Sequence, residues 1–307
     1  METRILKYFL TVAKMQNITR AAQELHITRA AQELHITQPT LSRQLKHLED
    51  ELGTQLLIRG KREITLTAEG KMLEHRAQDI LTLINQTTSE IQSFNHHELS
   101  GTINLGYVES NVSFFVDDLI AEFQTKYPLV KFQTYSAIGD DIKDKIDTGI
   151  LDLGFVITPI ETAKYNYLSL PIYERYGIFV NQTHPLAHQS TITADDLGDY
   201  PVIYPWRNIL QNELSAVVGL DPQKLNIKIT ANLSPNSLPL VHQHDYCMLG
   251  IDSISRFNPY NDIVFVPFEN YLQTSHRLIW RKNHHYSNLV MTFIEFVKQH
   301  VSRETQN

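Results

Sequence analysis

"ITRAAQELHITRAAQELHITQPTLSRQL", residues 18–45, decides how the N-terminal part of this 307-residue chain folds. The nine residues 18–26 are repeated without change as residues 27–35. Each copy places a threonine, Thr19 or Thr28, where it can cap a helix, and follows it with two alanines and a leucine that give a short apolar face. Either copy can therefore start a helix.

The segment that follows the repeat predicts an amphipathic helix. Thr37 is a suitable N-cap, Pro39 sits in the first turn where its missing N–H costs nothing, and Gly53 ends the pattern. The apolar face consists of Leu41, Leu45, Leu48 and Leu52. The opposite face carries groups able to form hydrogen bonds in a DNA groove, namely Gln38, Thr40, Ser42, Arg43 and Lys46. A solvated face is the ordinary interpretation of such a pattern, but a partner helix that ends two or three residues earlier favours a helix-turn-helix.

The segments on either side fit the same interpretation. Residues 3–15 form a first helix whose apolar stripe consists of Leu6, Phe9, Leu10 and Ala13, with Thr3 as a possible cap. Residues 56–70, "LLIRGKREITLTAEG", predict a two-stranded wing with a basic turn. Such a wing directs Arg59 and Arg62 at DNA phosphates, contacts that give affinity and orientation but carry no sequence information.

Read with one copy of the repeat, the run from "RILKYFLTVAKM" to "LLIRGKREITLTAEG" resembles the winged helix-turn-helix of the LysR-type transcriptional regulators. Members of that family place the helix that opens at "TQPTLSRQL" in the major groove. The resemblance therefore assigns to double-stranded DNA the residues Gln38, Pro39, Thr40, Ser42 and Arg43, with Lys46 on the same face and Arg59 and Arg62 in the wing.

The duplication departs from the family, which has a single copy. Nine residues turn a helix by roughly 900°, so in a continuous helix the two copies would face directions about half a turn apart. Only one copy could therefore fill the pocket that is formed with the recognition helix. The short turn His35–Gln38 favours residues 28–35 in the supporting position, with the first copy displaced. Alternatively, the first copy stays in place and the recognition helix moves outward by roughly 13 Å, which impairs DNA binding. A sequencing or cloning error is a third explanation.

A long helix is expected after the wing. Apolar residues recur at alternating spacings of four and three, as Leu73, Ala77, Ile80, Ile84, Thr87, Ile91 and Phe94. Another helix must cover such a heptad stripe, either from the same chain or from a second copy. The resemblance favours the linker helix of a homodimer, which can assemble further into a tetramer. The expected parts are a winged helix-turn-helix at 1–66, a linker helix at 67–98 and an effector-binding domain at 102–307.

Residues 102–157 alternate strands with helices, which predicts a parallel, open α/β sheet. Such sheets bind ligands beyond the carboxyl ends of their strands. The remainder resembles the family's effector domain, which is similar to a periplasmic binding protein. The resemblance divides it into subdomain I, about 102–175 and 275–307, and subdomain II, about 176–274.

Carried over by position, the cleft between these subdomains includes Ser110 and Asn111 at a helix N-terminus, where backbone N–H groups favour an anion. Ser136, Thr158 and Tyr204 are expected on the other walls. A small, carboxylate-bearing metabolite is the expected effector.

Charge and motifs limit the other functions. The net charge is −7, yet residues 1–99 carry 12 Lys and Arg against 12 Asp and Glu, so the acidic excess lies in the remainder, a poor nucleic-acid surface. No apolar run approaches 18 residues, so we expect a cytoplasmic protein without a membrane partner. Cys247 is the only cysteine, which excludes an intrachain disulfide.

The sequence has no GxSxG, GxGxxG or P-loop motif, and its short histidine pairs lack further ligands. We therefore expect no enzyme, no cofactor and no metal. The sequence predicts a LysR-type regulator that responds to a small molecule. The alternative is an effector-binding dimer whose DNA binding is impaired by the duplication.

Overall fold

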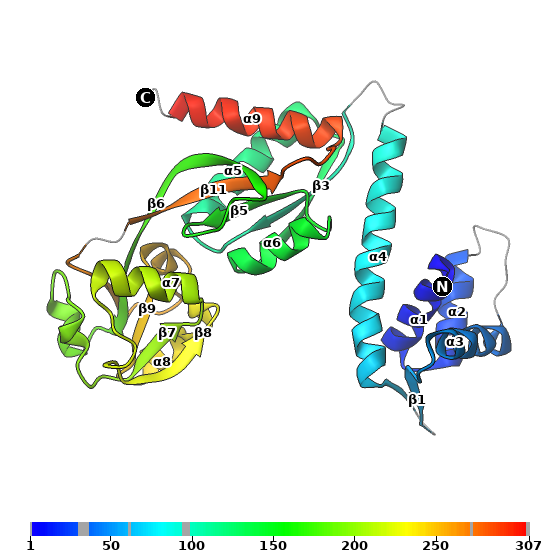
Figure 1. Ribbon diagram of the computed structural model, residues 1–307, viewed down its shortest axis with the longest axis horizontal. Helices are drawn as coiled ribbons and strands as arrows, with labels where there is room; N and C mark the ends of the chain where they lie inside the picture. The colour runs from blue at the N-terminus through cyan, green and yellow to red at the C-terminus, as the bar shows by residue number, and fades with distance from the viewer. Residues whose placement is uncertain (1, 30–36, 61–62, 94–98, 271–272, 305–307) are drawn as a thin grey trace. The chain divides into compact units, whose positions relative to one another are not determined.

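The computed structural model describes residues 2–29, 37–60, 63–93, 99–270 and 273–304 (Figure 1). The chain divides into two units, Met1–Phe94 and Asn95–Asn307. Within the described ranges, none of the helices combines the length and the apolar character needed to cross a bilayer.

The first unit is a winged helix-turn-helix that continues into a long helix. Its helices are α1 (Thr3–Met15), α2 (Ile18–Arg29), α3 (Gln38–Leu52) and α4 (Ala68–Ser93). The wing consists of strands β1 (Leu57–Arg59) and β2 (Ile64–Leu66), which pair antiparallel. The predicted N-terminal fold is confirmed.

The core of this unit forms where α1, α2 and α3 meet. Its buried side chains include Phe9 and Val12 of α1 and three of the predicted leucines of α3, which are Leu41, Leu45 and Leu48. The fourth, Leu52, is 42% exposed because it ends the helix just before Gly53, whose left-handed backbone (φ 67°) turns the chain away.

The first copy of the repeat packs against α3. Ala21 is fully buried and Ala22 nearly so, in the same core as the leucines of α3. The predicted displacement of the first copy is wrong, since its alanines are buried in the core. The predicted supporting role of residues 28–35 lies outside the described residues except for Thr28 and Arg29, which continue α2. The predicted start at Thr28 is wrong for the same reason. The predicted outward displacement of α3 also does not occur, because α3 packs directly against the first copy.

The residue that precedes each copy explains this choice. Asn17 precedes the first copy, and its Oδ1 accepts a hydrogen bond from the Arg20 backbone N–H at 3.0 Å. The second copy is preceded by His26. Asparagine is among the preferred helix N-caps, and such a cap contributes about 1 kcal/mol. The cap therefore favours a helix that begins with the first copy.

The second unit contains one nine-stranded mixed sheet. Strands β3 (Gly101–Tyr107), β4 (Val130–Ser136) and β5 (Leu153–Ile157) run parallel, as predicted. They alternate with helices α5 (Asn111–Lys126) and α6 (Gly139–Asp147), and α9 (Asn288–Glu304) joins their core. The sheet as a whole is not parallel, because β11 (Gln273–Arg281) pairs antiparallel with both β5 and β6 (Tyr165–Asn181).

Strand β6 connects two lobes of this unit. Residues 165–175 pair with β11, whereas residues 176–181 pair with β9 (Cys247–Ile251) and β10 (Ile263–Pro267). The first lobe has its own core around β3, β5 and α5, and the second has cores around the far half of β6. The second lobe also contains β7 (Val202–Pro205), β8 (Ile227–Ala231), α7 (Asn208–Glu213) and α8 (Leu238–Gln243). A rotation about β6 and β11 would move the lobes relative to each other.

A charged residue introduced into the first copy tests which copy of the repeat packs in the core against α3. We expect Ala21→Asp to destabilise the N-terminal unit by about 3 kcal/mol, because it buries a carboxylate without a partner. The matched variant is Ala30→Asp, the same position of the second copy, for which we expect a much smaller loss. Urea unfolding monitored by hydrogen exchange of α1 measures both. Equal losses would contradict the assignment of the first copy to the pocket.

Candidate nucleic-acid interface and ligand cavity

The polar face of α3 is exposed to solvent. Gln38, Pro39, Thr40, Arg43 and Lys46 are all exposed, and Ser42 is half-buried. Together with His47 and Asp50, most of them line a hollow along the helix. The leucines on the other side are buried in the core, which fixes the rotation of the helix and turns its polar groups outward. The structure thus brings the six predicted residues of α3 onto one surface.

The wing is tied to α3 through side chains. The Arg59 guanidinium donates a hydrogen bond from Nη1 to Ser42 Oγ at 2.9 Å. Glu49 Oε1 accepts hydrogen bonds from the backbone N–H groups of Leu56 and Leu57, at 2.9 and 3.0 Å, at the start of β1. Arg59 remains exposed and has further N–H groups for an anion. Arg62, the other predicted wing residue, lies outside the described residues.

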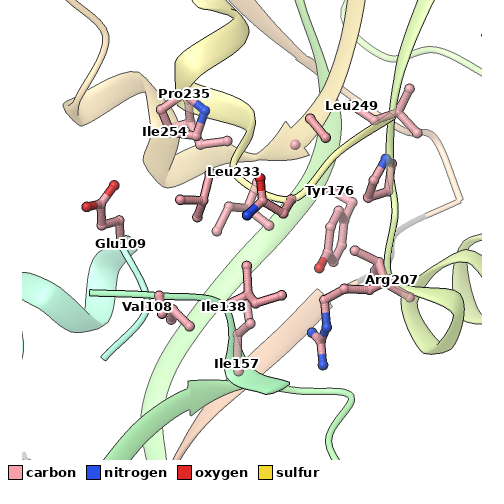
Figure 2. A pocket seen from close by; sticks show the side chains of 18 of the residues that line it. Val108, Glu109, Ile138, Ile157, Tyr176, Arg207, Leu233, Pro235, Leu249 and Ile254 are labelled. Atoms are coloured by element: carbon pink, nitrogen blue, oxygen red, sulfur yellow. The ribbon is translucent and has the colours of Figure 1, made fainter. Parts of the chain in front are cut away.

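A cavity with a volume of about 120 Å³ lies between the two lobes of the C-terminal unit (Figure 2). The first lobe contributes residues at the carboxyl ends of its parallel strands, including Val108, Ile138 and Ile157. The second contributes Tyr176, Arg207 and several aliphatic side chains. The cavity is at the place where an open α/β sheet binds ligands.

None of the five residues expected to bind an effector lines this cavity. Ser110 is fully buried beside it, Ser136 is exposed, Thr158 is hydrogen-bonded to Thr274 at 2.8 Å between the two Oγ1 atoms, and Tyr204 is buried in the core of the second lobe. Their neighbours in sequence do line it, and these are Glu109, Ala137, Ile157 and Pro205. The strand ends expected to line the cavity therefore do so, but the side chains that line it are one position away from the predicted residues.

The helix N-terminus expected to bind an anion is already occupied by a carboxyl side chain of the protein. The buried Glu174 carboxylate, on β6, accepts a hydrogen bond from the Asn111 backbone N–H at 2.8 Å. Its other oxygen accepts one from the Ser253 backbone N–H at 3.3 Å, in the second lobe. Glu174 thus bridges the lobes, and the expected effector site at Ser110 and Asn111 is filled by a side chain.

Two buried titratable groups meet at this bridge. Burial and a hydrogen bond that the protonated Glu174 carboxyl donates to Asp252 raise the pKa of Glu174 to about 7. Burial lowers the pKa of His276 to about 4, so its imidazole is neutral at neutral pH. His276 Nε2 lies 2.8 Å from Ser110 Oγ and 3.7 Å from Glu174 Oε1, and Nδ1 lies 3.2 Å from the Ile172 carbonyl oxygen. The last contact requires a proton on Nδ1, so Nε2 carries none and accepts a hydrogen bond from the Ser110 hydroxyl.

No pattern in the sequence pointed to either Glu174 or His276. Glu174 and His276 stand among other polar residues within strand segments, and they are 102 positions apart in the chain. Only the pairing of β6 with β11 brings them together. Among the described residues, no three histidine, cysteine or acidic side chains are arranged to hold a metal ion.

The charged side chains of the cavity are Glu109 and Arg207. Arg207 donates hydrogen bonds to both carboxylate oxygens of Asp140, from Nε at 3.0 Å and from Nη2 at 3.3 Å. Burial alone would raise the pKa of Asp140, but the hydrogen bonds and charges of Arg207 and Lys143 lower it, so the carboxylate is ionised. Arg207 therefore enters the cavity already paired.

Comparisons with known proteins agree with both parts of this arrangement. Residues 96–302 match the family described as LysR substrate binding domain, and residues 26–71 match the family described as bacterial regulatory helix-turn-helix protein, lysR family. Among curated relatives, the Hca operon transcriptional activator HcaR of Escherichia coli (strain K12) is 32% identical over 198 residues, covering 64% of this chain and 62% of the relative. The regulator AlsR of Bacillus subtilis (strain 168) is 33% identical over 212 residues, covering 66% and 64%. The chain thus spans less than two thirds of these relatives.

Two solved structures share the fold over almost the whole chain. The LysR family transcriptional regulator CbnR has a TM-score of 0.72 at 20% identity, covering 98% of this chain and 99% of that one. Full-length BenM has a TM-score of 0.54 at 26% identity, covering 99% and 98%. The helix-turn-helix match begins at residue 26 and so takes in the second copy, whereas the structure packs the first.

The pH dependence of stability tests the Glu174–His276 pair. The folded pKa of Glu174 is raised, so its contribution is lost as the pH rises from 4.5 to about 7. The folded pKa of His276 is lowered, so its contribution is lost as the pH falls from 6.5 to about 4. In the wild type the two groups change the free energy of unfolding in opposite directions with pH. Each slope is at most about 1.4 kcal/mol per pH unit.

Single substitutions uncover each slope. Relative to the wild type, we expect Glu174→Gln to lose stability as the pH falls below 6.5, and His276→Gln to lose stability as the pH rises above 4.5. Melting temperatures of the full chain between pH 4 and 7.5 measure both. The same slope in the two variants would refute the assignment of a protonated carboxyl and a neutral imidazole.

Proposed function

The chain belongs to the LysR family, and we propose that it is a sequence-specific DNA-binding transcriptional regulator whose DNA contacts respond to a small molecule. The observation that carries this proposal is the outward polar face of α3, held by three buried leucines and joined to the wing through Ser42 and Arg59. The curated relatives HcaR and AlsR are regulators by name.

On DNA, α3 enters the major groove with its N-terminal turns against the base edges. Gln38 and Arg43 are long enough to form paired hydrogen bonds, Gln38 with adenine and Arg43 with guanine. Lys46 and Arg59 contact phosphates, which orients the unit and makes affinity depend on salt. A solved structure similar to this chain, CbnR with its target DNA, has a TM-score of 0.70 at 21% identity, a likeness of fold alone.

Helix α4 provides the surface for a homodimer. It exposes a series of apolar side chains that water does not favour, Ile80, Leu83, Ile84 and Ile91, of which Ile91 is 62% exposed. A second copy of α4 would cover them as a coiled coil. The dimer then offers two recognition helices to two half-sites, and pairs of dimers would form a tetramer.

The effector acts by selecting one arrangement of the lobes. A ligand in the cavity contacts residues of both lobes and so binds most tightly when the lobes are at one angle. Glu174 bridges the same lobes behind it. The effector thereby shifts the population of lobe angles, and through subunit packing it alters the spacing or bending of the DNA half-sites.

A substitution of Arg43, at the centre of the polar face of α3, tests whether this face contacts DNA. We expect Arg43→Ala to weaken binding of a DNA fragment selected from random sequence by the wild type, by about tenfold or more in a gel shift, since a base contact contributes about 1–3 kcal/mol. The matched variant Lys131→Ala removes an exposed cation from the C-terminal unit and is expected to bind like the wild type. Failure of the wild type to select any fragment would contradict the proposal.

The duplication is tested by removing it. Deleting residues 18–26 and deleting residues 27–35 give the same chain, so one single-copy variant suffices. Because α3 packs on the first copy without displacement, we expect the natural chain and this variant to bind the selected fragment with affinities within about threefold. Binding by the single-copy variant alone would favour the alternative that the duplication impairs DNA binding.

A further inference from the structure

We propose that the cavity between the lobes binds a neutral, mainly apolar ligand about the size of one six-membered ring, with a single hydrogen-bonding group, and not a carboxylate. This inference rests on the proposed function and specifies the effector class. It differs from the expectation drawn from the sequence.

The walls of the cavity are aliphatic on both lobes. Val108, Ile138 and Ile157 face it from the first lobe, and Leu233, Leu249 and Ile254 from the second (Figure 2). Its volume of about 120 Å³ is close to that of an engineered apolar cavity of ~150 Å³ that binds benzene. An apolar ring therefore fits the space and removes these walls from water.

The cavity has no unpaired positive charge for an anion. The Arg207 side chain is 9% exposed and is held by both oxygens of the Asp140 carboxylate. The N-terminus of α5 is occupied by Glu174. Glu109 adds a carboxylate at the rim. A ligand carboxylate would therefore be desolvated beside other carboxylates with no unpaired cation to balance its charge, which is unfavourable.

Neighbouring cations are also committed to other groups. Arg175 pairs with Asp252 at 2.9 Å, and Arg256 lies 3.4 Å from the centre of the Phe114 ring. Neither lines the cavity. Neither of these two arginines is therefore free to pair with a ligand carboxylate in the cavity.

Tyr176 supplies the hydrogen-bonding group. It is only 6% exposed and lines the cavity, and Figure 2 shows its hydroxyl on the side of Ile138 and Arg207. Burial raises the pKa of this hydroxyl, so it stays neutral. No described residue forms a hydrogen bond with it. The hydroxyl is not among the fully buried polar atoms that lack a partner, so it is accessible from the cavity, where a ligand with a hydroxyl or carbonyl group would form a hydrogen bond with it.

The test compares phenol, toluene and benzoate, which share one ring, by calorimetric titration of the full chain. We expect phenol to bind more tightly than toluene, and benzoate not to bind at the same concentrations. Tyr176→Phe should weaken phenol binding by about fivefold and leave toluene unchanged. The matched control is Tyr204→Phe, which removes a buried hydroxyl in the core of the same lobe and should leave all three unchanged.

A second variant releases the paired arginine. Asp140→Asn removes the carboxylate that holds Arg207, so we expect benzoate to bind this variant at concentrations where it does not bind the wild type. Tighter binding of benzoate than of phenol by the wild type, or binding of none of the three probes, overturns the inference. A gel shift of the same samples separates the two proposals: intact DNA binding in either case leaves the proposed function standing, whereas its absence in the wild type contradicts the proposed function itself.

Discussion

The packing of three leucines of α3 against α1 and the first copy of the repeat is the interaction on which the rest of the N-terminal unit depends. Burial of Leu41, Leu45 and Leu48 contributes about 2 kcal/mol each and leaves α3 only one rotation about its own axis. That rotation places Arg43 and Lys46 outward. The hydrogen bond from Arg59 to Ser42 then adds the wing to the same surface.

Regular patterns in the sequence predicted most of the fold. The predicted bounds of the first helix, residues 3–15, matched those of α1, and the alternation of strands and helices matched β3 to β5. The predicted apolar stripe was right for Leu6 and Phe9, whereas Leu10 and Ala13 are only half-buried. The repeat could not be placed in this way, because two identical segments have identical propensity and identical apolar faces. What distinguishes them lies outside the repeat, in the cap from Asn17. The expected displacement of the first copy was therefore wrong.

The ligand cavity shows the limit of prediction by position. Parallel strands ending at one edge located the cavity, but successive side chains of an extended chain point in opposite directions, so an error of one residue exchanges a lining side chain for a buried one. Glu109 and Pro205 line the cavity, while Ser110 and Tyr204 do not. The prediction also assumed that the N-terminus of α5 was free to bind an effector. Only the tertiary structure shows that the Glu174 side chain occupies it.

Oxidative footprinting of the full chain with and without its selected DNA tests most directly whether α3 is the DNA-reading element. The buried leucines Leu41, Leu45 and Leu48 should be unreactive in both states. Pro39 and His47 should be reactive in the free protein and lose reactivity on the DNA. Unchanged reactivity of Pro39 and His47 on DNA, with protection confined to the C-terminal unit, would contradict the outward, DNA-facing position of this helix.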